Sequence, residues 1–347
     1  MINFCTLFDS NYLARGLALY ESLNKVCSAF HLYVVAFDDL SYNYLKSAGK
    51  PNLTPISLND FEDPELLAVK PTRSIAEYCW TCTPSIILYC IRNFNLHSCT
   101  YVDADMIFYE DPKILFDELK EKSVLITEHR YSREYDHAAT HGIYCVQFMY
   151  FKNDVRGTLA LTWWRDRCIE WCYAYQEDGK FGDQKYLDDW TTRFEGVHVL
   201  QHPGGGVAPW NLQQYTFQQH HGHVKITRLK DGQSFPLVFF HFHGLKFYTN
   251  NTVSCSGTLY EIEDTIKSLV YIPYIKLLIA TEAAIKKDHP ALNANGKRSP
   301  SLSKPKIYLE FMKELLINFR LGKLSPFKLR TYNFKKHYHY YNLSNLE

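Results

Sequence analysis

Residues 101–112 read YVDADMIFYEDP and place two carboxylates, Asp103 and Asp105, in a run that otherwise has the composition of a buried strand. Residues two apart on a strand point to the same face, so the two acids share one small space. Burial of an unpaired carboxylate costs several kcal/mol, and a second negative charge nearby raises that cost. The stretch therefore predicts a strand that ends at a site for a positively charged group.

The segments before this stretch alternate between strand and helix patterns. Apolar runs at 2–8 and 31–37 each end in acids. Strand patterns continue at 53–58 and 99–105, and helical patterns cover 12–26, 41–48 and 74–94. The alternation predicts an α/β fold with a mostly parallel, doubly wound sheet that helices flank on both faces. Ligands of such sheets bind beyond the carboxyl ends of the strands, where Asp9, Asp103 and Asp105 fall.

Beyond residue 110 the pattern is mixed. Strands are expected at 122–129, 143–151 and 237–244, and a helix at 154–178. The polar stretch 293–306 has the composition of a linker. We therefore expect a mixed sheet followed by a helical C-terminal extension.

The composition is that of a soluble globular protein. Of 347 residues, 46% are hydrophobic and 22% are charged. Aromatic residues make up 16%, which suits either stacking on rings and sugars or an aromatic core. The net charge of +1 gives no reason to expect a nucleic acid partner.

The sequence also predicts a location. The N-terminal residues contain no basic leader and meet an acid at Asp9, which predicts no signal peptide. The longest apolar stretch, 268–280, is too short for a bilayer span and contains Pro273 and Lys276. We expect a cytoplasmic protein whose ten cysteines are free thiols.

The C-terminal segment 304–347 is basic, with nine Lys or Arg against three acids, a net of +6. Its first part carries an apolar stripe at helical spacing, and basic and aromatic residues alternate after it. This composition suits peripheral contact with an anionic membrane surface at the inner face of the membrane. A solvated tail or an oligomer contact is the alternative.

Two pairs of side chains together suggest a metal site. A divalent cation would relieve the repulsion between Asp103 and Asp105, and oxygen ligands favour Mg²⁺ or Mn²⁺. His241 and His243 share one face of a later strand, and a nitrogen donor suits Mn²⁺ better. Taken alone, a D-x-D by chance is common and a histidine pair in an apolar strand is more often structural. The two pairs together favour a metal.

Three further motifs stand out. Asp183 and Gln184 follow a glycine turn, where they either face a cleft or cap a helix. The loop HPGGGVAPWN (202–211) suggests close approach of the backbone to a ligand. CWTC (79–82) has the spacing of a redox or zinc pair. Residues with a helical pattern surround it, however, and buried free thiols are the favoured interpretation.

Taken in order, these features resemble nucleotide-sugar glycosyltransferases of the GT-A fold. The resemblance is greatest to the family 8 type and its relatives in bacterial surface-glycan and lipopolysaccharide synthesis. It spans roughly residues 1–250 and depends on FDSNY, YVDADMIFYEDP, GDQKYL, the GxxxAPWN loop and HFHG. It implies a Rossmann-like mixed sheet and transfer of a sugar with retention of its anomeric configuration.

The resemblance also implies roles for the nucleotide-binding residues. Asp9 and Asn11 would hold the uracil and ribose of a UDP-sugar donor. Asp103 and Asp105 would bind Mn²⁺ (or Mg²⁺) and the ribose–diphosphate side. His241 would be the third protein ligand of the metal.

The remaining implied roles lie around the transferred sugar and the diphosphate. Asp183 and Gln184 would lie beside the sugar and the reacting carbon, and Asn211 would line the same pocket. Lys246 would contact the diphosphate. Arg73 is assigned to the same task from its charge and position.

The implied organisation is a catalytic domain over 1–250, with a nucleotide-binding half (1–110) and an acceptor half (111–250). A helical extension and linker (251–303) and the basic aromatic tail (304–347) follow it. The implied acceptor is a glycan or a lipid-linked saccharide.

Two other classes are alternatives. A sugar nucleotidyltransferase should show a glycine-rich loop with Arg and Lys after its first strand, and FDSNY has none. A non-catalytic nucleotide- or sugar-binding protein of the same fold is less consistent with a complete Asp-Asp-His set, although fold alone never proves activity.

Overall fold

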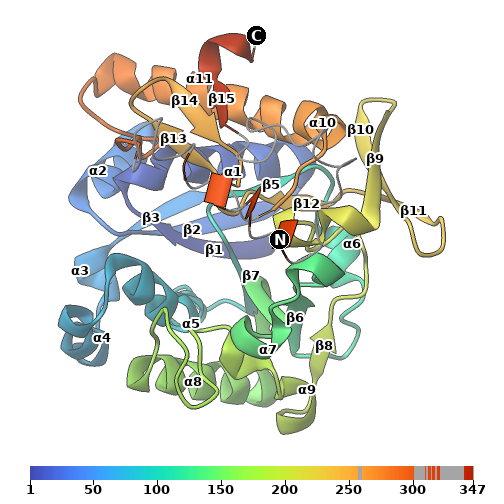
Figure 1. Ribbon diagram of the computed structural model, residues 1–347. Coiled ribbons are helices and arrows are strands. Elements are labelled where there is room, and N and C mark those ends of the chain that lie inside the picture. Colours follow the sequence, from blue (N-terminus) through green and yellow to red (C-terminus); the bar gives the residue numbers. More distant parts are fainter. Residues whose placement is uncertain are drawn as a thin grey trace.

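The computed structural model describes residues 1–256, 260–300 and 340–346, together with 309, 312, 313, 315, 316, 319 and 320. A seven-stranded sheet with the order β3-β2-β1-β4-β7-β6-β8 forms its centre (Figure 1). In this sheet only β7 runs antiparallel to its neighbours. The strands are β1 (Ile2–Phe8), β2 (Phe30–Ala36), β3 (Leu53–Ser57), β4 (Ser98–Val102), β6 (Val124–Glu128), β7 (Tyr144–Lys152) and β8 (Val197–Val199). The predicted α/β class with a mostly parallel sheet is confirmed.

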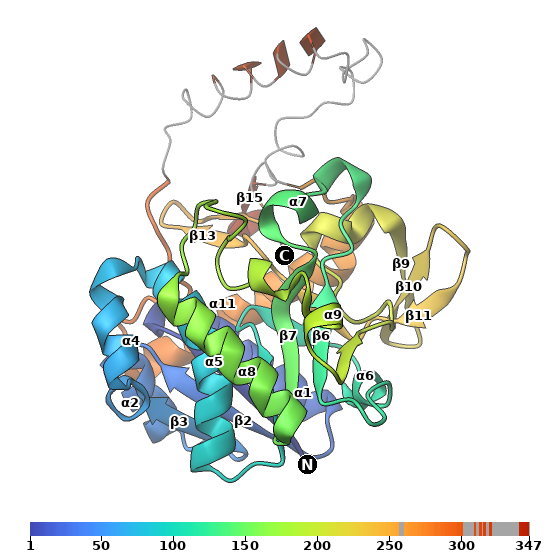
Figure 2. The same cartoon turned by 90° about the horizontal axis from the view of Figure 1, so that it is seen from below.

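Helices cover both faces of the sheet, as the alternation predicts. On one face lie α1 (Leu13–Val26), α2 (Asp39–Ala48) and α11 (Ile272–Asp288), and on the other lie α5 (Ile75–Asn93) and α8 (Val155–Glu170) (Figures 1 and 2). Each face buries its own hydrophobic core. The shorter helices are α3 (Leu58–Phe61), α4 (Pro64–Val69), α6 (Lys113–Phe116), α7 (Ala138–His141) and α9 (Trp190–Arg193).

Local signals explain where α5 begins and where α8 ends. Ser74 and Glu77 form a capping box at the start of α5, so two free N–H groups are satisfied there. The predicted helix 154–178 is shorter than expected, because Trp171 is extended and ends α8 at Glu170. The ten cysteines are free, as expected, and nine of them are buried.

The parallel strands end at one edge of the sheet. Phe8 of β1 lies opposite Ala36 of β2, and β4 pairs with β1 in the same direction. Asp9, Asp38 and Asp103 therefore follow their strands at this common edge, where the α/β pattern places ligands.

Small antiparallel sheets lie beside the main one. The ribbon of β5 (Met106–Phe108) and β12 (Phe239–His241) pairs His241 with Met106. The strand predicted over 237–244 ends earlier because Gly244 turns the chain with a φ of +81°. The other strands are β9 (Tyr215–His220), β10 (His223–Arg228), β11 (Ser234–Pro236), β13 (Lys246–Tyr248), β14 (Thr252–Ser254) and β15 (Tyr340–Asn342).

The C-terminal extension packs on α1. It runs from α10 (Asp264–Ile266) through a π-helical turn (Lys267–Tyr271) into α11 and buries Leu278 in the core that α1 shares. Within the described part of the chain, this run of Asp264–Asp288 is the one helix long and apolar enough to cross a bilayer. It is longer than the apolar stretch in the sequence suggests.

The predicted linker and tail are only partly described. Residues 293–298 form a closed turn instead of a free linker. Met312 and Phe319 of the predicted apolar stripe are exposed, and most of the basic segment assigned to membrane contact lies outside the described residues.

Candidate active site

Three predicted metal ligands come together at the carboxyl edge of the sheet. Asp103 directly follows β4, Asp105 directly precedes β5, and His241 ends β12. The Nε2 atom of His241 lies 3.1 Å from Oδ1 of Asp105 and 3.6 Å from Oδ2 of Asp103. One ligand atom from each of the three residues lies within 4.8 Å of the other two. We call these three residues the Asp-Asp-His cluster.

Hydrogen bonds fix the orientation of the cluster. Nδ1 of His241 lies 2.9 Å from Oε1 of Gln147, which orients the ring so that its Nε2 points at the two carboxylates. The hydroxyl of Tyr101 donates to Asp103 at 3.0 Å, and the Asp103 N–H donates to the Gln147 carbonyl at 3.2 Å. Gln147 is not among the predicted site residues, although a single amide inside the apolar run IYCVQFMYF is a signal for it.

The electrostatics of the cluster favour a cation. Burial lowers the pKa of His241, but the charges of Asp105 and then Asp103 outweigh it and raise this pKa well above its ordinary value. Burial and the Asp105 charge raise the pKa of Asp103 against the effect of His241. Burial also opposes ionisation of Asp105, yet His241 lowers its pKa to about 2. The two acids thus hold a positive charge on His241, where a divalent ion would compete with a proton.

The donor set fits Mn²⁺ or Mg²⁺. Adjacent ligands of an octahedral ion with bonds of about 2.1 Å are separated by about 3 Å. The two separations from His241 are close to this value. Two carboxylates and one imidazole suit Mn²⁺ and, less well, Mg²⁺.

A cleft of about 950 Å³ contains this cluster and most of the predicted site residues. Its volume lies at the upper end of the range for small-molecule sites. Asp9 and Asn11 lie in its wall, where both carboxylate oxygens of Asp9 accept hydrogen bonds from Asn11 at 3.0 Å. The predicted residues that line it are Asp9, Asn11, Asp103, Asp105, Asp183, Gln184, His241 and Lys246.

Asp183 and Gln184 enter the cleft from a turn. Gly182 adopts a φ of +52°, which favours glycine, and one 3-10 turn follows instead of the expected longer helical segment. Asp183 is buried, and burial together with the nearby Asp103 charge raises its pKa to about 8. Gln184 donates from Nε2 to the His141 carbonyl at 2.7 Å.

Two predicted contacts lie outside the cleft. The Arg73 guanidinium stacks on Tyr173 at 3.9 Å and donates to the Ile169 carbonyl, so the assignment of Arg73 to the diphosphate is not supported by its position. Asn211 is buried behind the wall, and its amide bonds to the backbone of Gly206, Ala208 and His129. Asn211 holds the glycine-rich loop in shape and does not line the pocket.

The cleft also contains groups that the sequence analysis did not select. Trp210 packs edge-on against His241 and His243 at centroid distances of 5.5 and 5.6 Å. Tyr131 lies 6.4 Å from Trp210, and Arg298 comes from the C-terminal extension. The high aromatic content of the chain was a signal for Trp210 and Tyr131, whereas no local pattern marked Arg298.

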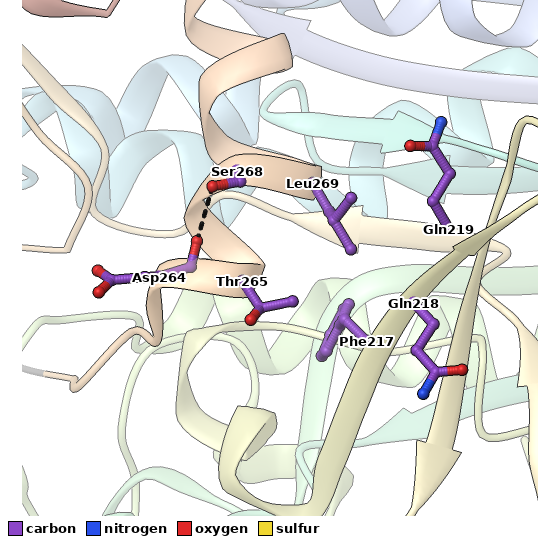
Figure 3. A pocket seen from close by; sticks show the side chains of 7 residues that line it. All are labelled: Phe217, Gln218, Gln219, Asp264, Thr265, Ser268 and Leu269. Carbon is purple, nitrogen blue, oxygen red and sulfur yellow. Dashed lines mark hydrogen bonds between the residues drawn. The ribbon is translucent and has the colours of Figure 1, made fainter.

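Two other features of the described chain lie apart from this cleft. The thiols of Cys5, Cys90 and Cys99 form a fully buried group in the core under α5. A second hollow, of about 630 Å³, lies between β9 and the start of the extension (Figure 3). Its acid, Asp264, is paired with Lys267 at 2.6 Å, and none of the predicted site residues lines it.

Comparison with known proteins gives relatives and a fold. No family model matches the sequence. The uncharacterised protein YfnD of Bacillus subtilis (strain 168) is 32% identical over 279 residues, which cover 79% of this chain and 87% of YfnD. YfnF of the same organism is 33% identical over 259 residues, which cover 72% of this chain and 84% of YfnF.

Among solved structures, the galactosyltransferase LgtC in complex with donor and acceptor sugar analogues superposes with a TM-score of 0.51. The superposition covers 80% of this chain and 96% of LgtC at 12% sequence identity, so the likeness is one of fold. The identity to the two Bacillus proteins extends over most of their length. The chain therefore belongs to the family of YfnD and YfnF, and it has the fold of the glycosyltransferase LgtC.

Proposed function

We propose that this protein is a metal-dependent glycosyltransferase. It would use Mn²⁺ (or Mg²⁺) to transfer a sugar from a nucleotide-sugar, a UDP-hexose, to a glycan or lipid-linked saccharide. The observation that carries the proposal is the Asp-Asp-His cluster in a cleft of about 950 Å³ at the carboxyl edge of the sheet. The fold shared with LgtC, a galactosyltransferase solved with donor and acceptor sugar analogues, supports it.

The residues of the cleft suit this chemistry. A bound divalent cation would neutralise the charge that develops on a diphosphate leaving group. Asp103, Asp105 and His241 would hold that cation, and Lys246 would add a positive charge beside it. No acid is then needed to protonate the leaving group.

The other end of the donor and the reacting carbon also have suitable neighbours. Asp9 and Asn11 would bind the base and ribose, with their mutual hydrogen bonds keeping them in place. Asp183 and Gln184 would lie beside the sugar. Retention of the anomeric configuration is part of the proposal, with Gln184 or, in its ionised form, Asp183 beside the reacting carbon.

A thermal-shift experiment tests the proposal. UDP-, GDP-, dTDP- and CMP-sugars are added to the purified protein with and without MnCl₂. We expect a UDP-sugar to raise the melting temperature only with Mn²⁺, since a ligand at 100 times its Kd stabilises the fold by about 2.7 kcal/mol. Absence of any Mn²⁺-dependent shift would contradict the proposal.

A pair of variants locates the effect. Asp105→Asn should abolish the Mn²⁺-dependent shift and the metal-dependent hydrolysis of the donor. The matched control is Asp117→Asn, which removes an exposed carboxylate paired with Lys113 and should leave both readouts unchanged. The ligand-induced shift is compared, and not the melting temperature itself, because removing one of two close negative charges also changes the stability of the free protein.

A further inference from the structure

The turn Asn293–Arg298 lies where the sequence suggests a linker. Oδ1 of Asn293 accepts from the Lys297 N–H at 2.8 Å, and its Nδ2 donates to the Lys297 carbonyl at 2.9 Å. The Gly296 N–H donates to the Asn293 carbonyl at 2.9 Å. These bonds close the segment on itself, so its side chains have defined positions.

The turn is docked on the start of α1, beside the predicted nucleotide-binding residues. The Ala294 carbonyl accepts from the Ala14 N–H at 3.0 Å, and the buried Arg15 donates to the Asn295 carbonyl at 3.2 Å. Gly296 has a φ of +59°, and a Cβ on it would lie 3.0 Å from the Asn11 carbonyl oxygen. Only glycine permits this close approach.

The helix α11 anchors the turn from the other side. The buried Glu282 pairs with Lys297 at 2.8 Å and accepts from Nδ2 of Asn295 at 3.2 Å. The Lys297 ammonium group is therefore already engaged in an ion pair. The turn is held between α1 and α11 and forms part of the cleft wall.

Arg298 is the residue that this arrangement presents to the cleft. Its N–H donates to the Phe247 carbonyl at 3.2 Å, and its carbonyl accepts from Thr249 at 3.1 Å, so its backbone is fixed beside β13. Its side chain lines the cleft and has no hydrogen bond or ion pair with any other described residue. Arg298 is exposed, and an unpaired guanidinium on a fixed backbone at a cleft is suited to an anionic ligand.

The charges around Arg298 indicate which anion. Tyr12 also lines the cleft, and burial raises the pKa of its hydroxyl. The Asp105 charge raises this pKa further, and the Arg298 charge lowers it. Lys246, on the strand next to Arg298, is a second cation without an ion pair among the described residues. Two cations thus share the cleft with the Asp-Asp-His cluster, an arrangement that a metal-bound diphosphate would complete.

We propose that Arg298 binds the diphosphate of the nucleotide-sugar in the cleft that also contains the Asp-Asp-His cluster. The C-terminal extension then completes the donor site, and the domain that ends near residue 250 is insufficient for donor binding. This inference rests on the proposed function and concerns the same cleft.

The test uses the full chain with MnCl₂ and two probes, UDP and uridine, whose affinities are measured by calorimetry. Arg298→Gln should weaken UDP binding by about 10-fold or more, as expected for loss of a charge-assisted pair. Uridine binding should not change, because it has no phosphate. The UDP affinity of the Arg298→Lys protein should lie between those of the wild-type and Arg298→Gln proteins, since lysine keeps the charge but not the planar fork.

Arg92→Gln is the matched control, because Arg92 is exposed near the end of α5 and outside the cleft. Equal UDP affinity of the Arg298→Gln and Arg92→Gln proteins would overturn the inference while leaving the proposed function intact. Equal weakening of UDP and uridine would also overturn it, because Arg298 would then act on the shape of the site. If the wild-type protein binds no UDP in the presence of Mn²⁺, the proposed function itself fails.

Discussion

Asp183 is a buried acid, and the folded protein favours its protonated form. Its pKa is raised from an ordinary 3.8 to about 8, first by burial and second by the Asp103 charge. Between these two pH values the folded protein keeps a proton that the unfolded chain releases. The free energy of unfolding therefore falls as the pH rises, by about 1.4 kcal/mol per pH unit for one group.

We predict that Asp183→Asn removes this dependence, because the amide stays neutral at every pH. Relative to the wild-type protein, its free energy of unfolding should be nearly unchanged at about pH 4 and higher by several kcal/mol at about pH 8, because the difference accumulates over the whole interval between the two pKa values. Urea unfolding at a series of pH values measures the difference. Asp117→Asn is the control and should follow the wild-type profile, and parallel profiles for all three proteins would contradict the prediction.

At the scale of single residues, the sequence predicted the polar residues that directly follow or precede strands and turns. Asp9, Asp103 and Asp183 all lie in the cleft. Arg73 and Asn211 were assigned from charge or from motif resemblance, and neither reaches it. Their partners, Tyr173 for Arg73 and backbone groups for Asn211, satisfy them elsewhere, and such tertiary contacts leave no local pattern in a sequence.

At the scale of elements, β7 determines how His241 is oriented. This strand inserts antiparallel between β4 and β6 and places Gln147 within hydrogen-bond distance of His241. Nε2 of Gln147 is buried and has no hydrogen-bond partner among the residues that the structure describes, so the amide is retained at a cost in stability. Its Oε1 atom accepts from His241 and orients the ring. Amides and carboxylates in this position hold a ligating histidine in one tautomer.

We predict that Gln147→Leu weakens Mn²⁺ binding by about 10- to 100-fold, because the His241 ring loses its hydrogen-bonded partner. The fold should persist, since leucine has a similar size and removes an unpaired polar atom. Calorimetric titration with MnCl₂ measures the affinity without any substrate. Gln218→Leu, at an exposed position of β9, is the control and should bind Mn²⁺ like the wild-type protein; equal affinity for Gln147→Leu would show that Gln147 does not support the metal site.

The elements differ in how far the sequence could predict them. β1, β2 and β3 agree with prediction to within one residue, because local periodicity defines each strand–helix unit. β4 begins within one residue of the prediction and ends three residues earlier, at Val102. The direction of β7 and the pairing of β5 with β12 depend on residues more than 40 and 130 positions apart. No local pattern encodes such pairings, so the selection of His241, and not His243, as the ligand beside the acids depended on the resemblance.

At the scale of the whole molecule, the C-terminal extension is part of the main core. Leu278, Leu292 and Ala294 belong to the same buried cluster as α1. The polar composition of 293–298 suggests a linker, but its partners lie on α1, nearly 280 positions earlier in the chain, and on α11. The cleft is therefore lined both by residues near the start of the chain and by the C-terminal extension.

Glu282 tests this coupling, since it joins α11 to the turn that forms part of the cleft wall. Burial opposes its ionisation, but Lys297, Asn295 and Lys286 together lower its pKa below the ordinary 4.5. An acid whose pKa is lowered by folding stabilises the folded state fully at pH values above its unfolded pKa. This stabilisation is lost as the pH falls through the folded pKa. The ion pairs are partly exposed, which limits their contribution.

We predict that Glu282→Gln lowers the free energy of unfolding by about 1–3 kcal/mol at pH 7, because two lysines lose their partner. The difference from the wild-type protein should be smaller at an acidic pH well below the ordinary 4.5, since acid protonates Glu282 in the wild-type protein as well once the pH falls through its lowered folded pKa. Urea unfolding at both pH values measures it, with Asp288→Asn on the exposed side of the same helix as the control. Mn²⁺-dependent UDP binding should weaken in parallel, because the turn that presents Arg298 loses its anchor. A loss of equal size at both pH values would mean that the side chain acts through packing and not through its charge.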